Sequence, residues 1–360
     1  MTVRAALERY VVTTGWAKRG LWAWALRDVS WLFGWLAARR KAAYMAGKKV
    51  PTDVGIPVIV VGNVIAGGAG KTPVVIAIVQ HLQAHGLEVG VLSRGHGTAA
   101  HAAQAARPVL ATSSAADVGD EPLLLAQRTA APVWVGADRA AAAAGVRQAH
   151  PAVQVLVCDD GLQHLALKRT VEVVVFDERG IGNGWPLPSG PLREAWPRQP
   201  MPGAVQLALT SGSFPAAAFG VQRELASHAV RADGTQRALS EFSNPSNPAW
   251  AVAGIAKPQA FFDALRSVGV NVVHPLALPD HFNFDSKEVS KHLDRWAISP
   301  QMPLLCTEKD AVKLWHHPTN ARPDAWAVAL TAKPDASFFA ALDKALVDHW
   351  MPMNRTPPQP

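Results

Sequence analysis

The chain has 360 residues, of which 49% are hydrophobic and 18% charged, so it can fill the cores of two α/β domains and is not intrinsically disordered. Its formal charge is +7, but residues 1–50 carry ten Lys or Arg against two acidic residues, which leaves −1 for the other 310. Because the basic charge belongs to one segment, we expect no nucleic-acid partner. The two cysteines stand apart in apolar runs, which excludes a zinc-finger spacing and favours reduced thiols in the cytoplasm. No signal peptide is expected either.

Residues 19–41 project as a helix with a narrow stripe of small and polar residues and a wide apolar face. Five of the thirteen tryptophans lie in this region: Trp16, Trp22, Trp24, Trp31 and Trp35. Arg27 and Asp28 near the middle disfavour a bilayer span. The pattern, with basic residues beside it, favours a helix lying in a membrane interface against anionic lipid. The alternative is a helix that docks on the protein's own core or on a partner, and Asp28, which projects onto the apolar face, fits neither reading.

Beyond Lys49, strand and helix patterns alternate, which predicts a mainly parallel sheet of the P-loop type with helices on both faces. The first unit is strand 58–62, helix 72–85 and strand 88–92. Its glycine-rich turn, Gly67-Gly68-Ala69-Gly70-Lys71-Thr72, is suited to cradling polyphosphate, with Lys71 on the outer phosphates and Thr72 on Mg²⁺. The P-loop pattern is incomplete, since Ile65 replaces its first glycine, and the alternative is an ordinary glycine-rich turn.

Polar residues follow the strands at the edge where such sheets bind ligands. Asn63 and Arg94 are candidate substrate contacts, although the loop at Arg94 is equally consistent with a plain connection. Residues 98–116 are expected to form a loose surface connection. Asp120 and Glu121 precede the helical run 123–128, where the sequence alone favours a helix cap for Asp120 over a general base that accepts a proton from a substrate hydroxyl.

A second motif follows the helix 139–149, where strand 154–158 ends in Asp159-Asp160-Gly161. An apolar strand ending in Asp downstream of a Gly-Lys-Thr loop is typical of a Walker B strand. We expect one carboxylate to bind Mg²⁺ and the other to orient a neighbour, the alternative being an ordinary turn. Strand 171–176 leads into a long loop, 177–202, in which Arg193 either stabilises transferred phosphate or forms a surface salt bridge.

Residues 210–248 are interpreted as a linker with short strands, after which a second α/β pattern begins. Its expected elements are strands 250–255, 270–274, 303–306 and 326–330 and helices 258–268, 285–297 and 335–348. His281 lies in a loop, where a lone histidine is ordinarily just solvated. The domain scheme is therefore a basic, Trp-rich helical region (1–50), a P-loop domain (51–210), a smaller α/β domain with its linker (211–350) and a disordered tail (351–360).

Taken together, these motifs resemble those of the tetraacyldisaccharide 4′-kinase family, the lipid A disaccharide kinases of Gram-negative bacteria. The resemblance covers about residues 20–345 and rests on motifs in family order. They are Val60-Val61-Gly62-Asn63, Gly67-Gly68-Ala69-Gly70-Lys71-Thr72-Pro73, Ser93-Arg94-Gly95-His96-Gly97, Gly119-Asp120-Glu121-Pro122, Asp159-Asp160-Gly161-Leu162-Gln163-His164, Pro188-Ser189-Gly190-Pro191-Leu192-Arg193-Glu194, Asp280-His281-Phe282 and Thr307-Glu308-Lys309-Asp310-Ala311-Val312-Lys313. His96 and Leu162 depart mildly from the family, which usually has Tyr and often Phe there.

The resemblance implies ATP-dependent phosphorylation of the 4′-hydroxyl of an acylated glucosamine disaccharide 1-phosphate, at the cytoplasmic face of the inner membrane. It further implies that Asp120, paired with His281, is the general base and that Lys71 and Arg193 stabilise charge on the γ-phosphoryl group. Thr72, Asp159, Asp160 and Glu121 match the magnesium neighbourhood.

Two other classes of protein remain alternatives. One is a P-loop ATPase switch that moves a protein or a metal, but such loops typically carry a second lysine where Ala66 stands. The other is a non-enzymatic membrane-binding module, which would leave Lys71, Asp159 and Asp160 without a role.

Overall fold

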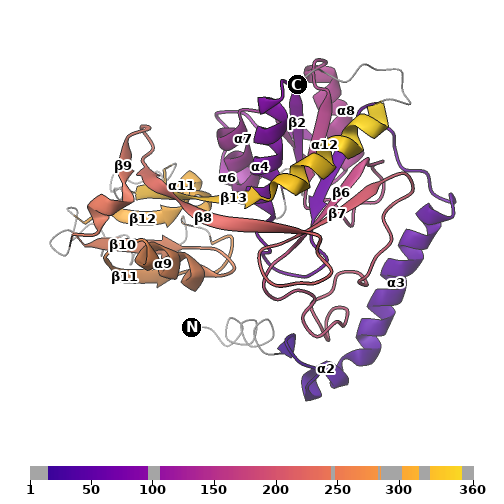
Figure 1. Cartoon of the computed structure of the whole chain (residues 1–360), viewed down its shortest axis with the longest axis horizontal. Helices are drawn as coiled ribbons and strands as arrows, with labels where there is room; N and C mark the ends of the chain where they lie inside the picture. The colour runs from indigo at the N-terminus through magenta and orange to yellow at the C-terminus, as the bar shows by residue number, and fades with distance from the viewer. Residues whose placement is uncertain are drawn as a thin grey trace.

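The computed structural model describes residues 15–95, 106–244, 248–282, 284, 302–315 and 325–350. It contains two α/β lobes joined by a pair of long strands, with helices α2 and α3 running along one side of the larger lobe (Figure 1). The predicted helix 285–297 and the predicted tail 351–360 lie outside the described residues.

Parallel strands form the centre of the larger lobe, in the order β7-β6-β1-β5-β2-β4, and the short antiparallel β3 closes the edge. They are β1 (Val58–Gly62), β2 (Val89–Ser93), β3 (Arg107–Pro108), β4 (Val133–Val135), β5 (Val155–Asp159), β6 (Val171–Phe176) and β7 (Val205–Thr210). Every residue of β1, β2, β5 and β6 is buried, as expected for strands covered on both faces. The predicted strands 58–62, 88–92, 154–158 and 171–176 are confirmed within one residue, whereas β4 was not predicted.

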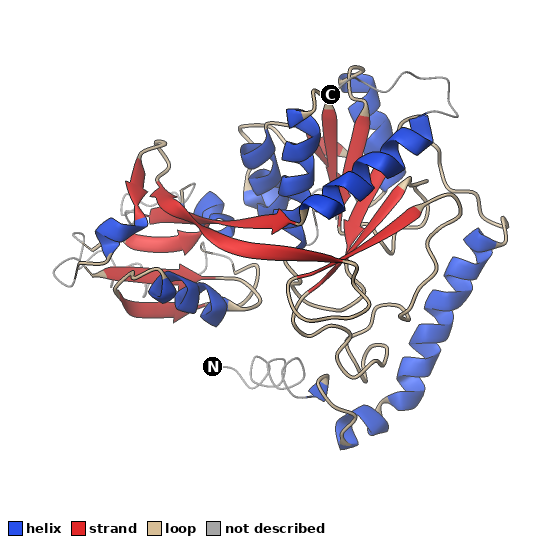
Figure 2. Cartoon of the chain, viewed as in Figure 1, coloured by secondary structure: helices blue, strands red, loops and turns tan. Residues whose placement is uncertain are grey.

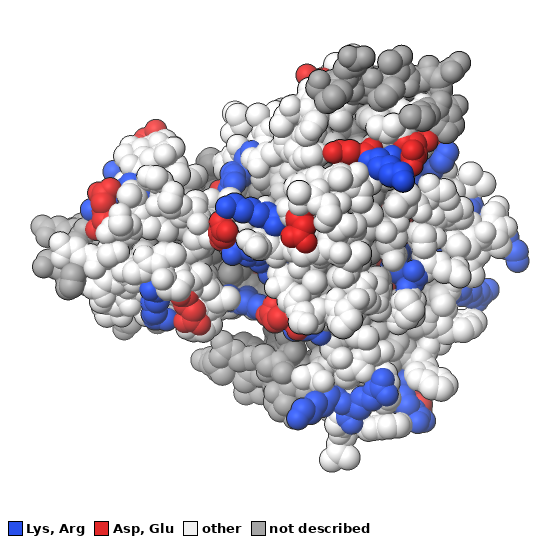
Figure 3. All heavy atoms as spheres, in the orientation of Figure 1, with Lys and Arg blue, Asp and Glu red and all other residues white. Residues whose placement is uncertain are grey.

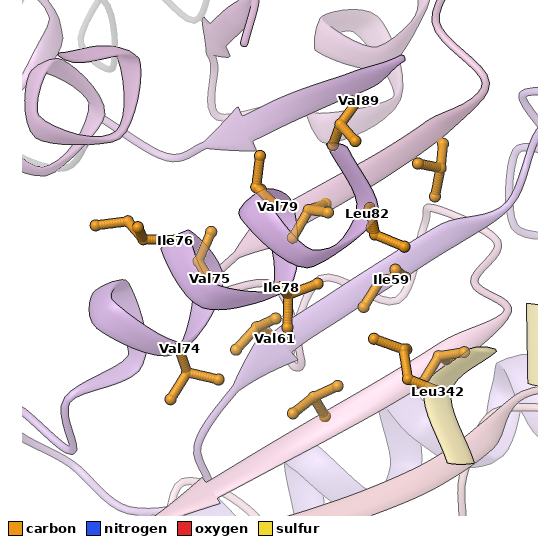
Figure 4. Close-up of a cluster of buried hydrophobic side chains, with 14 of the residues drawn as sticks. Ile59, Val61, Val74, Val75, Ile76, Ile78, Val79, Leu82, Val89 and Leu342 are labelled. Atoms are coloured by element: carbon orange, nitrogen blue, oxygen red, sulfur yellow. The ribbon is translucent and has the colours of Figure 1, made fainter. Parts of the chain in front are cut away.

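Helices cover both faces of this sheet, so the predicted P-loop-type fold class is confirmed. They are α4 (Lys71–Ala84), α6 (Ala115–Val118), α7 (Asp120–Thr129), α8 (Arg139–Ala149) and α12 (Ala336–Trp350). Ile59 and Val61 of β1 pack against α4, whereas Val58 and Val60 face the α8 side, because successive side chains of a strand alternate between faces. Figure 4 shows Val75, Ile78 and Leu82 of α4 over β1.

The C-terminal helix α12 belongs to the larger lobe. Its residues Phe338, Leu342 and Leu346 share a core with β1 and α4, and Figure 4 shows Leu342 beside them. The domain assignment 211–350 is therefore wrong for this helix. The pattern correctly predicted a helix at 335–348, but helical periodicity does not say which sheet a helix packs against.

The smaller lobe is a second parallel sheet, in the order β11-β10-β12-β13. Its elements are β9 (Gln236–Ala238), η2 (Leu239–Phe242), β10 (Ala249–Ala253), α9 (Pro258–Ser267), β11 (Val272–Ala277), β12 (Leu304–Thr307) and α11 (Glu308–Leu314). The two lobes are joined by β8 (Phe219–Val230) and β13 (Ala325–Pro334), which pair antiparallel and run from one lobe to the other (Figure 2). The interpretation of residues 210–248 as a linker with short strands is corrected here, since this segment holds the 12-residue strand β8 of the connecting ribbon and then β9 and η2 of the smaller lobe.

The predicted helix 19–41 is two helices, α2 (Leu21–Ala25) and α3 (Arg27–Met45), because the backbone leaves helical geometry at Leu26. The stripe of small residues faces the protein. Ala23 and Ser30 are buried, and the Ser30 hydroxyl lies 2.7 Å from that of Ser189 in the loop after β6. Gly34 lets the helix approach closely, since a Cβ there would stand 3.3 Å from the Pro186 ring.

The opposite face of these helices is exposed. Trp31 and Trp35 retain 69% and 55% of their surface, and neighbouring apolar residues share this exposure: Leu21, Trp22, Trp24, Val29, Leu32, Phe33 and Leu36. Asp28, which fitted neither expectation, points to solvent and forms an ion pair with Arg27 at 3.3 Å. Among the described residues, no helix has the length and apolar character needed to cross a membrane.

Candidate active site

The glycine-rich loop between β1 and α4 has the geometry of a phosphate-binding turn. Gly67 and Gly70 have φ values of +90° and +70°, the left-handed region that glycine adopts without strain. The Asn63 amide braces the turn, since its Nδ2 donates to the Gly67 carbonyl at 3.2 Å and its Oδ1 accepts from Lys71 Nζ at 3.3 Å. Lys71 and Thr72 open helix α4, whose free N–H groups favour an anion at this point.

Two arginines donate hydrogen bonds to backbone carbonyls of this loop. Arg223 of β8 donates to the Ala69 carbonyl at 2.5 Å, and a Cβ at Gly70 would lie at the same distance from its guanidinium. Arg179 donates to the Ala66 carbonyl at 3.3 Å. Neither arginine was predicted from the sequence, because each contacts the loop only after the chain has folded back over more than a hundred residues. The connecting ribbon thus touches the phosphate loop directly.

The two carboxylates at the end of β5 have different surroundings. Asp160 accepts from Arg193 Nη1 at 3.1 Å and lies 3.4 Å from Lys71 Nζ. Although burial acts in the opposite direction, the charges of Lys71 and Arg193 lower the pKa of Asp160. Asp160 therefore positions both cations predicted to act on the γ-phosphoryl group.

Asp159 is buried, and its Oδ1 has no hydrogen-bond partner among the residues that the structure describes. Burial raises the pKa of Asp159 to about 7, with the negative charges of Glu121 and Asp160 acting in the same direction and Lys71 opposing them. The buried Arg139, which the sequence analysis missed, donates to the backbone carbonyl of Asp159 at 3.1 Å and so fixes this strand end. A buried carboxylate oxygen without a partner is costly, so the site fits a bound cation.

The structure separates the roles within the predicted magnesium set. Asp159 has a free oxygen, and the negative charge of Glu121 acts on it, whereas the oxygens of Asp160 are already engaged by two cations. Thr72 lies at the N-terminus of α4, next to Lys71. Asp159 is therefore better suited than Asp160 to bind an oxygen-preferring divalent cation, and the roles of Glu121 and Thr72 in a magnesium site stay predictions.

Asp120 and His281 meet across the lobe interface without a substrate. His281 Nδ1 lies 3.2 Å from Asp120 Oδ1, and Asp120 also accepts from the Glu121 backbone N–H at 2.9 Å. Gly119 (φ +101°) and His281 (φ +57°) both have left-handed backbones, which shape these two turns. The hydrogen bond from His281 helps to lower the pKa of Asp120 despite burial, and the same bond is the main cause of the raised pKa of His281. The expectation of a merely solvated loop histidine from sequence alone is corrected.

Two lysines on one face of α11 complete this cluster. Lys313 Nζ lies 3.2 Å from Asp120 Oδ2 and donates to the Phe282 carbonyl at 3.1 Å. Lys309 Nζ lies 3.2 Å from Glu121 Oε1 and 3.3 Å from His281 Nε2. The sequence analysis predicted no role for either lysine beyond membership of a polar motif. Their spacing of four residues places them on one face of a helix, and this spacing could have indicated a shared site.

We expect Lys313→Met to lower turnover by up to about 100-fold, because misplacing a reacting group by about 1 Å has this effect. The charge of Lys313 contributes to the lowered pKa of Asp120, so its loss raises that pKa. A base acts only when ionised, so the acid limb of the pH–kcat profile should move to higher pH. Lys313→Arg should restore part of the rate. A Lys313→Met profile with an unmoved acid limb would show that Lys313 acts only on stability.

The other predicted substrate contact, Arg94, is exposed just after β2, at the same sheet edge, and its role stays a prediction.

Gln163 was predicted only as part of a family motif, yet its side-chain amide links the end of β1 with the long loop after β6. It donates to the Asn63 carbonyl at 3.1 Å and to Glu194 Oε1 at 2.9 Å.

A phosphate-binding loop, two carboxylates beside it and an acid–imidazole pair assembled from two lobes define a P-loop phosphotransferase. The family model described as tetraacyldisaccharide-1-P 4′-kinase matches residues 22–347. The chain belongs to this family.

Individual relatives agree with the family match. The chain is 50% identical over 336 residues to a tetraacyldisaccharide 4′-kinase of Acidovorax ebreus, covering 92% of this chain and 93% of that protein. It is 47% identical to one of Verminephrobacter eiseniae, with 97% and 77% covered. A crystal structure of LpxK from Aquifex aeolicus, described as an "apo" form in complex with ATP, superposes with a TM-score of 0.72 at 22% identity, covering 91% of this chain and 98% of that one.

Proposed function

We propose that this chain transfers the γ-phosphoryl group of ATP to the 4′-hydroxyl of a tetraacylated glucosamine disaccharide 1-phosphate, a step of lipid A synthesis. The observation that carries the proposal is the Asp120–His281 pair, whose members come from different lobes and lie beside Glu121. The charge of Glu121 contributes to the raised pKa of Asp159, which supports a position of the pair near the carboxylates at the end of β5. Mass spectrometry and ³¹P NMR of the reaction product test the assignment. One added phosphoryl group at the 4′ position of the acceptor would support it, and a phosphoryl group elsewhere on the sugar would contradict it.

In this mechanism, the chain mainly aligns its substrates and stabilises charge, because the phosphoryl-transfer transition state is loose. Lys71 and Arg193 offset negative charge on the transferred group, and Asp160 holds both in place. Asp120 accepts the proton of the 4′-hydroxyl. His281 orients Asp120 through Nδ1 and is itself held by Lys309 at Nε2. Closure of the two lobes therefore assembles the base.

A magnesium ion fits this site on the chemistry of its donors. Asp159, Thr72 and Glu121 would hold it, directly or through water, and it would neutralise charge on the nucleotide phosphates. The unpartnered Oδ1 of Asp159 is the observation that supports this assignment.

The exposed Trp-rich face of α2 and α3 supports binding to a membrane surface, at the cytoplasmic face of the inner membrane where the acylated acceptor is embedded. Since the small-residue stripe is occupied by the loop around Ser189, the aromatic face is the one left for lipid. Figure 3 shows basic side chains along the lower edge of the molecule, where α2 and the start of α3 lie. Aromatic residues flanked by Lys and Arg suit a helix lying at an anionic interface.

We expect Trp31→Ser with Trp35→Ser to weaken binding to phosphatidylglycerol-containing vesicles by at least about tenfold. Burying one large apolar side chain is worth about 1.5–3 kcal/mol, and about 1.4 kcal/mol corresponds to tenfold. Co-sedimentation with the vesicles measures this. Leu110→Ser, which alters an equally exposed apolar side chain elsewhere, is the control. Unchanged sedimentation of the Trp variant would place the membrane contact on another surface.

A further inference from the structure

A cluster of possible metal ligands lies away from the active site, between the phosphate-loop helix and the C-terminal helix. His81 lies in the last turn of α4, His85 caps the C-terminus of this helix, and Asp343 faces them from α12. His81 Nε2 lies 2.9 and 3.1 Å from the two oxygens of Asp343. One candidate ligand atom from each of the three residues lies within 4.8 Å of the others.

The imidazole rings of His81 and His85 are oriented by contacts of the kind that orient metal-binding histidines. His85 Nδ1 lies 2.8 Å from the His81 carbonyl oxygen, so it carries the proton and leaves Nε2 with a free lone pair. A histidine that binds a metal through one nitrogen commonly donates from the other to a carbonyl in this way. The His81 ring stacks on Phe339 at 4.2 Å, which fixes its orientation. These contacts orient both rings without a bound ion.

We propose that His81, His85 and Asp343 bind a divalent transition-metal ion of the Zn²⁺ class. Two imidazoles and one carboxylate suit Zn²⁺, Co²⁺, Ni²⁺ or Cu²⁺, whereas Mg²⁺ prefers oxygen ligands. The site is partly open, with 16% of the His81 side chain and 42% of the Asp343 side chain exposed, so a water can fill the fourth position.

A bound ion would clip α12 to α4. The helix α12 follows the ribbon strand β13, and α4 begins at the phosphate-binding Lys71, so the ion would join two elements of the larger lobe that are distant in sequence. The proposal does not depend on the kinase reaction, because none of these three side chains belongs to the active site. The simpler explanation of the contact is a His81–Asp343 ion pair, which gives His85 no part.

Isothermal titration of the full chain with ZnCl₂ at pH 7.5, in saturating Mg²⁺, separates the two explanations. We expect one Zn²⁺ site that is weakened at least about tenfold by His85→Ala and by Asp343→Asn. His150→Ala, which removes an exposed histidine elsewhere, is the control and should leave the affinity unchanged.

Co²⁺ substitution provides a direct readout of the ligands. Visible absorption of four-coordinate Co²⁺ should appear with the wild-type chain and be lost in His85→Ala, while Mg²⁺-dependent phosphoryl transfer is retained. Thermal unfolding of the wild type should shift upward with Zn²⁺, and that shift should vanish in Asp343→Asn. Absence of Zn²⁺ binding, or binding indifferent to both His85 and Asp343, would overturn the proposal in favour of the ion pair.

Discussion

Asp120→Asn is expected to lower kcat by about 10² to 10⁴ while leaving the KM for ATP nearly unchanged, since a positioned general base contributes about this factor. The substitution keeps the shape of the side chain but removes its charge. Asp120 belongs to α7, and its carboxylate pairs with the Glu121 backbone N–H, His281 and Lys313, none of which is in the phosphate loop, so nucleotide binding should survive. Steady-state kinetics with both substrates varied measures the two effects separately.

The control for this prediction concerns stability. Asp120 is the partner of Lys313, and removing one member of a buried ion pair destabilises a protein by itself. The double variant Asp120→Asn, Lys313→Met removes both members of this ion pair and should be equally slow. Loss of ATP binding with an unchanged kcat in Asp120→Asn would contradict its assignment as the base.

Lys71→Ala is expected to lower kcat/KM for ATP by about 10² to 10³, the effect of removing one preorganised group that stabilises developing charge. In the structure Lys71 bridges Asn63 and Asp160, which aims its ammonium group at the loop. The loss should be larger in kcat than in ATP affinity, since charge on the transferred group grows in the transition state. Single-turnover measurements at saturating ATP test this.

Lys168→Ala is the matched control, because Lys168 forms an exposed ion pair with Asp53 on the larger lobe and should contribute little to any rate. A Lys71→Ala chain that keeps its single-turnover rate at saturating ATP would limit this lysine to nucleotide binding.

Much of the larger lobe could be predicted because its strands are short, mostly apolar and buried on both faces. Val58–Gly62 and Val171–Phe176 are the clearest cases. The connecting ribbon could not be recognised in the same way, because β8 alternates buried and exposed residues irregularly, as a strand outside a two-sided core does. A three-residue strand such as β4 is too short to show any period.

The same distinction, between local patterns and long-range contacts, applies to the residues of the active site. The phosphate loop and the Asp159-Asp160 turn are local in sequence, so their chemistry could be predicted from adjacent residues. The contacts of Asp120 with His281 and Lys313 join positions 161 and 193 residues apart, and they depend on how two lobes close. Residue type alone favoured a helix cap and a solvated histidine there, and only the family resemblance predicted that they pair.

The most direct test of the account is transfer of label from γ-³²P-ATP to lipid A disaccharide 1-phosphate in detergent micelles, comparing the wild type with Asp159→Ala. Binding of ATP and a cooperative unfolding transition should first be shown for both proteins. We predict labelled lipid with the wild type and a loss of at least about 100-fold in the variant, since Asp159 is the carboxylate that fits the cation. An unlabelled lipid with folded, ATP-binding wild type, or equal labelling by Asp159→Ala, would contradict the account.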